Sequence, residues 1–237
     1  MTRTILAVDC SQREASIVLS RGPLVYARSF EPLKDSTREQ FWDVLRELCL
    51  EACVEPWELE AVAVAVGPGG FTGLRVSIAF AKAVALAREI PALALGSASV
   101  FAASDAARGG RGPWLVALAS KSGSAWCARV TRGDDGSFVE EAGAVVDAAA
   151  FLPRVSSVTA LRGVVLTDEH FDPALTLVAA QTQAMVRVLS VDPCALAALA
   201  QQALSRGAES HASALSPIYA REPEAVTKWR ELHKPKS

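Results

Sequence analysis

The stretch "AVAVAVGPGGFTGLRVSIAFAKAVALARE", residues 61–89, decides the fold class of this chain. Residues 61–66 are a short apolar, β-branched run, which is typical of a buried strand. From Thr72 onward, apolar residues recur on one side of a helix. A strand, a glycine-rich turn and a helix N-terminus can together bind an anion, because free N–H groups and the helix dipole point the same way. The stretch therefore raises the question of whether its loop holds a phosphate.

The loop "GPGGFTGLR" (67–75) lacks the lysine of a G-x-x-x-x-G-K-[ST] phosphate loop. We expect its glycines to let the helix 72–89 begin close to the sheet and approach another protein. Arg75 is then expected to pair with a partner carboxylate rather than with a bound anion. Under the alternative interpretation, the anion-binding residues are Gly69, Gly70 and Arg75.

The composition is that of a globular protein with one large domain or two small ones, because 51% of the 237 residues are hydrophobic and 21% are charged. The net charge of −2 predicts no surface dedicated to coating nucleic acid. No apolar run is long enough to cross a bilayer, and the first residues do not resemble a signal peptide. Five scattered cysteines and three separated histidines indicate a reducing cytoplasmic location and no zinc site.

The order of predicted elements repeats once along the chain. Three hairpin-linked strands are followed by alternating helices and strands, first from residue 4 and again from residue 114. The capping-box pair Ser36 and Glu39 marks the start of the first helix, 36–53. "RGGRGP" (108–113) is interpreted as a linker. We therefore predict an N-terminal lobe, a C-terminal lobe and a solvated C-terminal segment, with the boundaries 1–107, 113–206 and 207–237.

Four motifs lie in the same order as in a known family: "ILAVDCS" (5–11), "GPGGFTGLRVS" (67–77), "KSG" (121–123) and "PIYAREPEAVTKW" (217–229). With them, nearly the whole chain resembles the TsaB (YeaZ) family, which is needed for threonylcarbamoyladenosine in bacterial tRNA. The resemblance implies an α/β fold of two tandem actin-like ATPase (ribonuclease-H-like) lobes, each a mixed sheet with flanking helices.

The family is known as a catalytically silent relative of TsaD, the subunit that binds ATP and metal and transfers the threonylcarbamoyl group to adenosine 37. The resemblance therefore implies a scaffold without a catalytic residue, cofactor or metal of its own. Its implied partners are a TsaD-type subunit, a TsaE-type ATPase through the complex, and possible second copies of the chain through the same helices. Contact with tRNA is implied to be indirect.

Three stretches of the sequence bear on whether the chain is catalytically inactive. The turn after Asp9, residues 9–14, contains no glycine to cradle a phosphate, so Asp9 either orients a hydrated Mg²⁺ or only makes strand-end hydrogen bonds. The catalytic relative carries two metal-binding histidines where residues 96–105 stand, and this segment has no imidazole. The lobe-two turn Ala119–Ser124 lacks the acidic groups usual in the family, and Gly70 replaces a more frequent serine.

The helix 36–53 has an apolar stripe wider than one core requires. It is either wedged between the sheet and a neighbouring helix, or part of an intermolecular bundle. Because the first two helices of the family dock on TsaD or on a second copy, we favour the bundle. The predicted partner interface consists of Phe41, Trp42, Leu45, Cys49, Leu50, Thr72, Arg75 and Ala79.

The alternative function is an independently active small-molecule kinase or ATPase of the same superfamily. It requires nucleotide binding by the chain alone. A peptidase is excluded on residue types, because no Ser-His-Asp grouping or metal pair can be assembled from this sequence.

Overall fold

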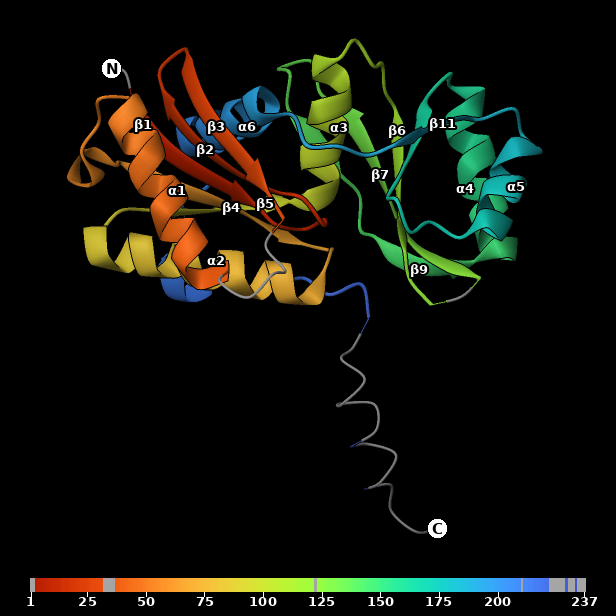
Figure 1. The fold of residues 1–237 in the computed structure, drawn as a ribbon. Coiled ribbons are helices and arrows are strands. Elements are labelled where there is room, and N and C mark those ends of the chain that lie inside the picture. The colour runs from red at the N-terminus through yellow and green to blue at the C-terminus, as the bar shows by residue number, and fades with distance from the viewer. Residues whose placement is uncertain are drawn as a thin grey trace.

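The computed structural model describes residues 3–31, 37–121, 123–209 and 211–221, together with Trp229 and His233, and gives only the backbone of residues 37–39. The chain forms two mixed sheets that lie side by side, each with helices packed on it (Figure 1). The fold class predicted from the sequence is confirmed. The capping-box pair Ser36 and Glu39 lies outside the described side chains.

The first sheet has the strand order β3-β2-β1-β4-β5. Its strands are β1 (Thr4–Asp9), β2 (Ala15–Arg21), β3 (Leu24–Phe30), β4 (Ala61–Gly67) and β5 (Ala92–Gly96). The first three form an antiparallel meander, and β4 and β5 continue parallel to β1. Three helical segments accompany them: α1 (Thr37–Glu51), the 3₁₀ turn η1 (Pro56–Glu58) and α2 (Phe71–Arg88). Apolar residues of α1 and α2 form one core with one face of the sheet.

The second sheet repeats this plan in the order β11-β10-β6-β7-β8. Its elements are β6 (Trp114–Ala119), β7 (Ser124–Arg132), β8 (Phe138–Glu140), β9 (Ala144–Asp147), β10 (Val164–Thr167) and β11 (Met185–Val188), with α4 (Ala148–Ala160) and α5 (Pro173–Ala180). Both β8 and β9 pair with β7, so together they occupy the position that β3 has in the first sheet. The three hairpin-linked strands predicted from residue 114 are therefore four strands in the structure.

Two helices lie between the sheets, and the second of them differs from the predicted lobe assignment. In α3 (Ser97–Ala107), Val100 and Ala103 pack in a core of the first sheet, while Ala98 and Phe101 pack against Trp114 and other residues of the second sheet. In α6 (Pro193–Ser205), Leu196 and its neighbours pack against the first sheet. The boundary drawn at 113–206 is therefore wrong for α6, because local hydrophobic periodicity does not reveal which sheet a helix covers.

The stretch 108–113 is fixed on both sides rather than a free linker. The Gly110 N–H donates to the Asp105 carbonyl oxygen at 2.9 Å, and Arg108 donates to the Ser190 carbonyl oxygen at 3.0 Å. Next to it, the indole of Trp114 is buried and donates to Asp105. Glycine and proline content predicted a linker here but not these contacts.

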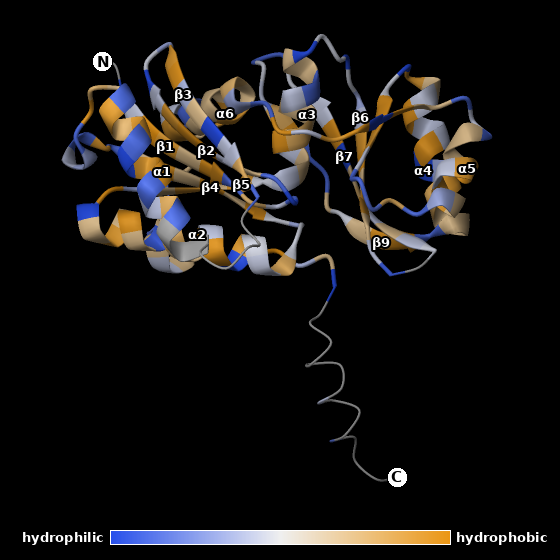
Figure 2. Ribbon diagram, viewed as in Figure 1, coloured by the Kyte–Doolittle hydropathy of each residue, from blue (hydrophilic) through white to orange (hydrophobic). Residues whose placement is uncertain are grey.

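The strands β1 and β4 are buried along their whole length because helices cover both faces of the sheet. Figure 2 shows this as hydrophobic colour on the central strands. The 3₁₀ turn η2 (Ala212–Ala214) also joins the first core through Ala212 and Leu215. The prediction of a solvated segment is therefore wrong for this part of 207–237. None of the helices in the described part of the chain is long and apolar enough to cross a membrane.

Candidate functional site: the interlobe cleft and the helices α1 and α2

The glycine loop (residues 67–75) packs against the turn that joins β1 and β2 of the same chain. The Gly70 N–H donates to the Ser11 carbonyl oxygen at 2.7 Å, so this amide is already satisfied. A Cβ atom at Gly69 would clash with the Ser11 carbonyl oxygen, and one at Gly73 would clash with the Cys10 carbonyl oxygen. These two glycines are therefore required for close backbone packing between the loop and the turn after β1.

Asp9 lies at the end of β1 and is fully buried. Its Oδ1 accepts a hydrogen bond from the Ser11 N–H at 2.7 Å, whereas Oδ2 has no partner among the described residues. Burial raises the pKa of the Asp9 carboxyl, and the hydrogen bonds from Ser11 oppose that shift only in part. The strand-end hydrogen bond is thus present, and a role in orienting Mg²⁺ stays a prediction.

A cleft of ≈ 640 Å³ separates the two lobes at the carboxyl ends of β1, β4, β6 and β10. Its lining includes Arg13 and Gly70 from the first lobe and Ala119, Asp168 and His170 from the second. Such a crevice at the carboxyl ends of parallel strands is the usual ligand position in α/β folds. The sequence analysis missed Asp168 and His170, which have no local motif and are placed only by the pairing of β10 with β6.

Two aspartates hold the lobe-two turn Ala119–Ser124. Asp168 accepts hydrogen bonds from the Ala119 N–H at 2.7 Å and the His170 N–H at 3.0 Å, although burial still raises its pKa. Asp172 accepts from the Gly123 N–H at 2.7 Å and from the first turn of α5, and these bonds lower its pKa. Carboxylates from outside the turn thus stabilise it; Ser122 lies outside the described residues.

The segment 96–105 forms the N-cap and most of α3, and a carboxylate from the second lobe meets the N-terminus of this helix. Glu140 Oε2 accepts hydrogen bonds from the Ser99 N–H at 3.2 Å and the Ser99 hydroxyl at 3.1 Å. Burial raises the Glu140 pKa. In the described part of the chain, no group of three or more His, Cys, Asp or Glu side chains has an arrangement that could hold a metal ion.

Arg75 on α2 is engaged by the C-terminal segment. Its Nε donates to the Tyr219 hydroxyl at 2.9 Å, and its guanidinium lies 3.6 Å from the centre of the Phe71 ring. The rings of Phe71 and Tyr219 are 4.9 Å apart, and the Ile218 N–H donates to Val66 at 2.7 Å. Arg75 therefore anchors residues 218–219 beside the loop, a role that the sequence analysis did not assign to it.

Three residues of the predicted partner interface belong to the core instead. Phe41, Leu45 and Cys49 are buried in the first lobe, where Phe41 packs against Phe80 of α2. The prediction that they offer contact surface is corrected, because α1 turns this side toward the sheet. They support the exposed face of α1 from within.

Five residues of the predicted interface remain exposed. Trp42 is 44% exposed and lies edge-on to Phe80 at 4.8 Å, while Leu50 is 73% exposed. On α2, Thr72, Arg75 and Ala79 are exposed at helical spacing. The exposed side of α1 thus carries large apolar side chains, of which Trp42 contacts α2, whereas Thr72 of α2 also lines the cleft.

Comparison with known proteins gives matches of three kinds. A family model described as "TsaD: tRNA N6-adenosine threonylcarbamoyltransferase" matches residues 34–229. The "tRNA threonylcarbamoyladenosine biosynthesis protein TsaB" of Bacillus subtilis is 33% identical over 100 residues, 42% of this chain and 44% of the relative. The protein of the same name from Buchnera aphidicola (subsp. Schizaphis graminum) is 28% identical over 126 residues, 53% of this chain and 60% of the relative.

These alignments span about half the length of the curated relatives. Among solved structures, "YeaZ from Pseudomonas aeruginosa" superimposes with a TM-score of 0.72 at 19% identity. That match covers 92% of this chain and 99% of the other. At this identity the structural match establishes a shared two-lobed fold.

Proposed function

The chain belongs to the tRNA N6-adenosine threonylcarbamoyltransferase family, on its TsaB (YeaZ) side, and from that membership we propose that it is a non-catalytic scaffold. It binds and activates a TsaD-type catalytic subunit. The complex then transfers a threonylcarbamoyl group to N6 of adenosine 37 in tRNAs reading ANN codons. In this proposal the chain uses no cofactor or metal of its own and works in the cytoplasm, where its partner meets tRNA.

The observation that carries the proposal is the closure of the glycine loop on the first hairpin. A phosphate cradle needs free N–H groups at the loop and a glycine-rich hairpin opposite it. Here the Ser11 carbonyl oxygen accepts the Gly70 amide, and Ser11 and Cys10 fill the space beside Gly69 and Gly73. The loop supports α2 in a fixed position, which is what a docking helix requires.

The exposed side chains of α1 and α2 support the docking role. Trp42 and Leu50 leave apolar area in water, which is costly unless a partner covers it. Aromatic and aliphatic anchors of this kind dominate the binding energy of protein interfaces. A TsaD-type subunit occupies this face in the active complex, and a second copy of the chain occupies it otherwise. A TsaE-type ATPase and tRNA join through the complex.

Co-purification with a TsaD-type protein tests the proposal. The tagged chain, expressed with that protein, is expected to recover it in a stable complex that modifies tRNA on addition of the other components. A TsaD-type subunit that modifies tRNA equally well without the chain would contradict the scaffold role.

The alternative is an independent kinase or ATPase, and the cleft of ≈ 640 Å³ between the lobes is the observation that favours it. Calorimetry of the isolated chain with ATP and Mg²⁺ separates the two functions. The scaffold is expected to give no heat of nucleotide binding and no hydrolysis, whereas a kinase binds ATP alone.

A further inference from the structure

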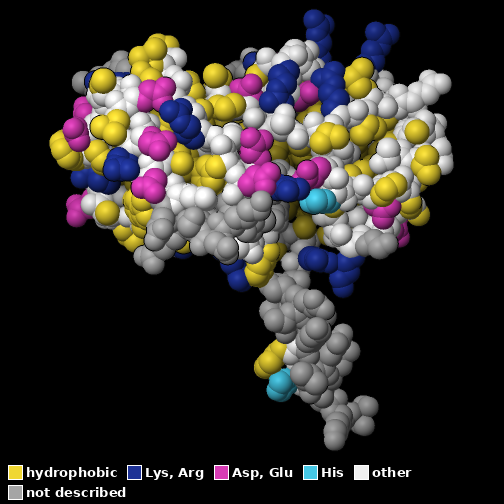
Figure 3. Space-filling view, viewed as in Figure 1, with side chains coloured by type: hydrophobic (Ala, Val, Ile, Leu, Met, Phe, Trp, Pro, Cys, Tyr) yellow, Lys and Arg dark blue, Asp and Glu magenta, His cyan; other side chains and the backbone are white. Residues whose placement is uncertain are grey.

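Four arginines from three segments lie at one end of the second lobe. Arg108 caps α3, Arg111 lies in the stretch 108–113, Arg162 follows α4, and Arg187 lies in β11. The Val164 N–H donates to the Pro113 carbonyl oxygen at 3.0 Å, which joins two of these segments directly. Figure 3 shows Lys and Arg side chains gathered over this upper edge of the molecule, beside α3.

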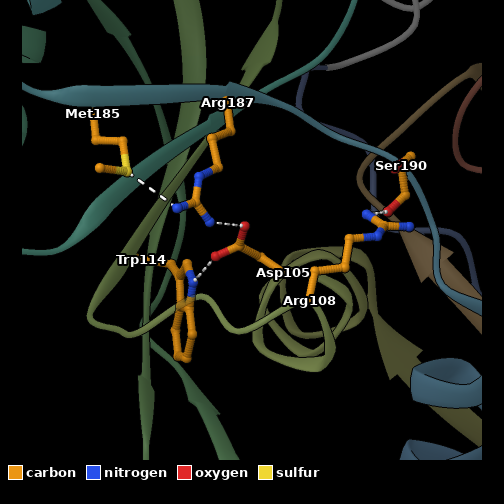
Figure 4. A network of polar contacts seen from close by, with 6 residues as sticks. All are labelled: Asp105, Arg108, Trp114, Met185, Arg187 and Ser190. Carbon is orange, nitrogen blue, oxygen red and sulfur yellow. Dashed lines mark hydrogen bonds and ion pairs between the residues drawn. The ribbon is translucent and has the colours of Figure 1, made fainter.

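The charges of these arginines are mostly left unneutralised. Asp105 pairs with Arg187 at 2.7 Å, and that pair is part of the network drawn in Figure 4. The Arg108 side chain donates to the Ser190 carbonyl oxygen. Arg108, Arg111 and Arg162 are exposed without a carboxylate partner among the described residues. A nearby carboxylate, Asp135 in the turn before β8, is itself paired with Arg206 at 2.5 Å.

Helix stability explains part of this arrangement. Arg108 and Arg162 lie at the C-terminal ends of α3 and α4, where the helix dipole stabilises a cation. Arg111 lies outside any helix, so stabilisation by a helix dipole does not explain why an arginine stands at this position. Gly109 beside it has open space around its Cβ position, and a large ligand can approach the backbone there.

Arg108, Arg111 and Arg162 lie at the opposite end of the second sheet from the cleft, and Arg187 reaches that end through its side chain, which pairs with Asp105 beside Trp114. β6 begins at Trp114 and β10 at Val164, next to the arginines, whereas Ala119 and Asp168 at the far ends of these strands line the cleft. A ligand on the arginine surface therefore leaves the cleft open. It also leaves exposed the outer faces of α1 and α2 in the first lobe.

The geometry points to a direct contact between this arginine surface (Arg108, Arg111, Arg162 and Arg187) and the phosphate backbone of RNA. The guanidinium group is planar, permanently charged and suited to two-point binding of phosphate. The choice of RNA over an acidic protein rests on the proposed function, in which the complex acts on tRNA. This surface would hold the tRNA body while chemistry proceeds on the partner subunit.

Fluorescence anisotropy with labelled, unmodified tRNA tests the contact on the full chain alone. At roughly 50 mM salt we expect binding whose affinity falls with about the second to third power of the salt concentration, as two to three phosphate contacts require. The double charge-reversal variant Arg111→Glu, Arg162→Glu should bind tRNA at least about tenfold more weakly. The power of the salt concentration with which its affinity falls should be lower by about 2. The matched control Arg3→Glu, Arg21→Glu reverses two exposed arginines at the start of the first sheet and should retain binding.

Equal losses in the two double variants, or no binding by the unaltered chain, would overturn the proposal. So would polyglutamate that binds the same surface as strongly as tRNA, because the partner would then be an acidic protein. Recovery of the TsaD-type protein by the Arg111→Glu, Arg162→Glu variant is measured in parallel and should be unchanged. If the unaltered chain fails to recover that protein, the scaffold proposal fails and the tRNA measurement still stands.

Discussion

At the scale of single residues, Asp9 is a buried carboxylate whose Oδ2 has no partner among the described residues. Because burial raises its pKa above the ordinary value of 3.8, the folded state favours the protonated form, and ionisation at higher pH destabilises the fold. Asp9→Asn should therefore increase the free energy of unfolding relative to the unaltered chain. The gain should be larger at pH 7.5 than at pH 5.

Denaturant unfolding at the two pH values measures this difference. Ser97→Ala is the control, because it removes a buried hydroxyl without a partner among the described residues and leaves the Ser11 groups that bond Asp9 in place. Its effect should not depend on pH. A strong loss of stability in Asp9→Asn at pH 7.5 would show that the ionised carboxylate has a partner that this account lacks.

Asp105 on α3 connects this helix to β6 and β11 of the second sheet. It accepts hydrogen bonds from the buried Trp114 indole at 2.9 Å and from Arg187 at 2.7 Å (Figure 4). Asp105→Ala leaves the indole N–H unsatisfied and should cost about 2–3 kcal/mol of stability. Arg187→Ala should cost less, about 1 kcal/mol, because the arginine side chain is 40% exposed. Thermal melts that reverse this order would contradict the assignment.

At the scale of elements, α1 and α2 are predicted to be the docking surface. The double variant Trp42→Glu, Leu50→Glu should weaken association with a TsaD-type partner roughly thirtyfold or more, because truncating an interface anchor commonly costs about 2 kcal/mol. The melting temperature should fall only slightly, since the one described ring contact of Trp42 is its edge-on contact with Phe80.

Leu177→Glu provides the matched control for docking, because Leu177 is 69% exposed on α5 of the other lobe. It should bind the partner normally. Phe41→Glu should instead unfold the first lobe, since Phe41 is buried. Unchanged association in a folded Trp42→Glu, Leu50→Glu variant would move the interface away from α1 and α2.

At the scale of the whole molecule, periodicity was enough to predict the repeated order of strands and helices. The run 61–66 became β4 and the helix 72–89 became α2 within one residue at each end. Contacts between distant segments were not predictable in this way. Tyr219 and Arg75 are 144 positions apart, and the Gly70 amide after β4 donates to Ser11 after the neighbouring strand β1. The local sequence pattern predicts a helix or a strand. Which distant segment that helix or strand contacts depends on how the complete chain packs.

The central claim is that the chain activates a TsaD-type subunit without chemistry of its own, and complementation tests it most directly. Cells depleted of the chain are supplied with the unaltered protein or with Asp9→Ala, and threonylcarbamoyladenosine in their tRNA is quantified by mass spectrometry. Depletion should abolish the modification, and a folded Asp9→Ala protein should restore it nearly to the level of the unaltered chain. Complete failure of a well-folded, partner-bound Asp9→Ala protein would instead show that the chain performs chemistry at Asp9.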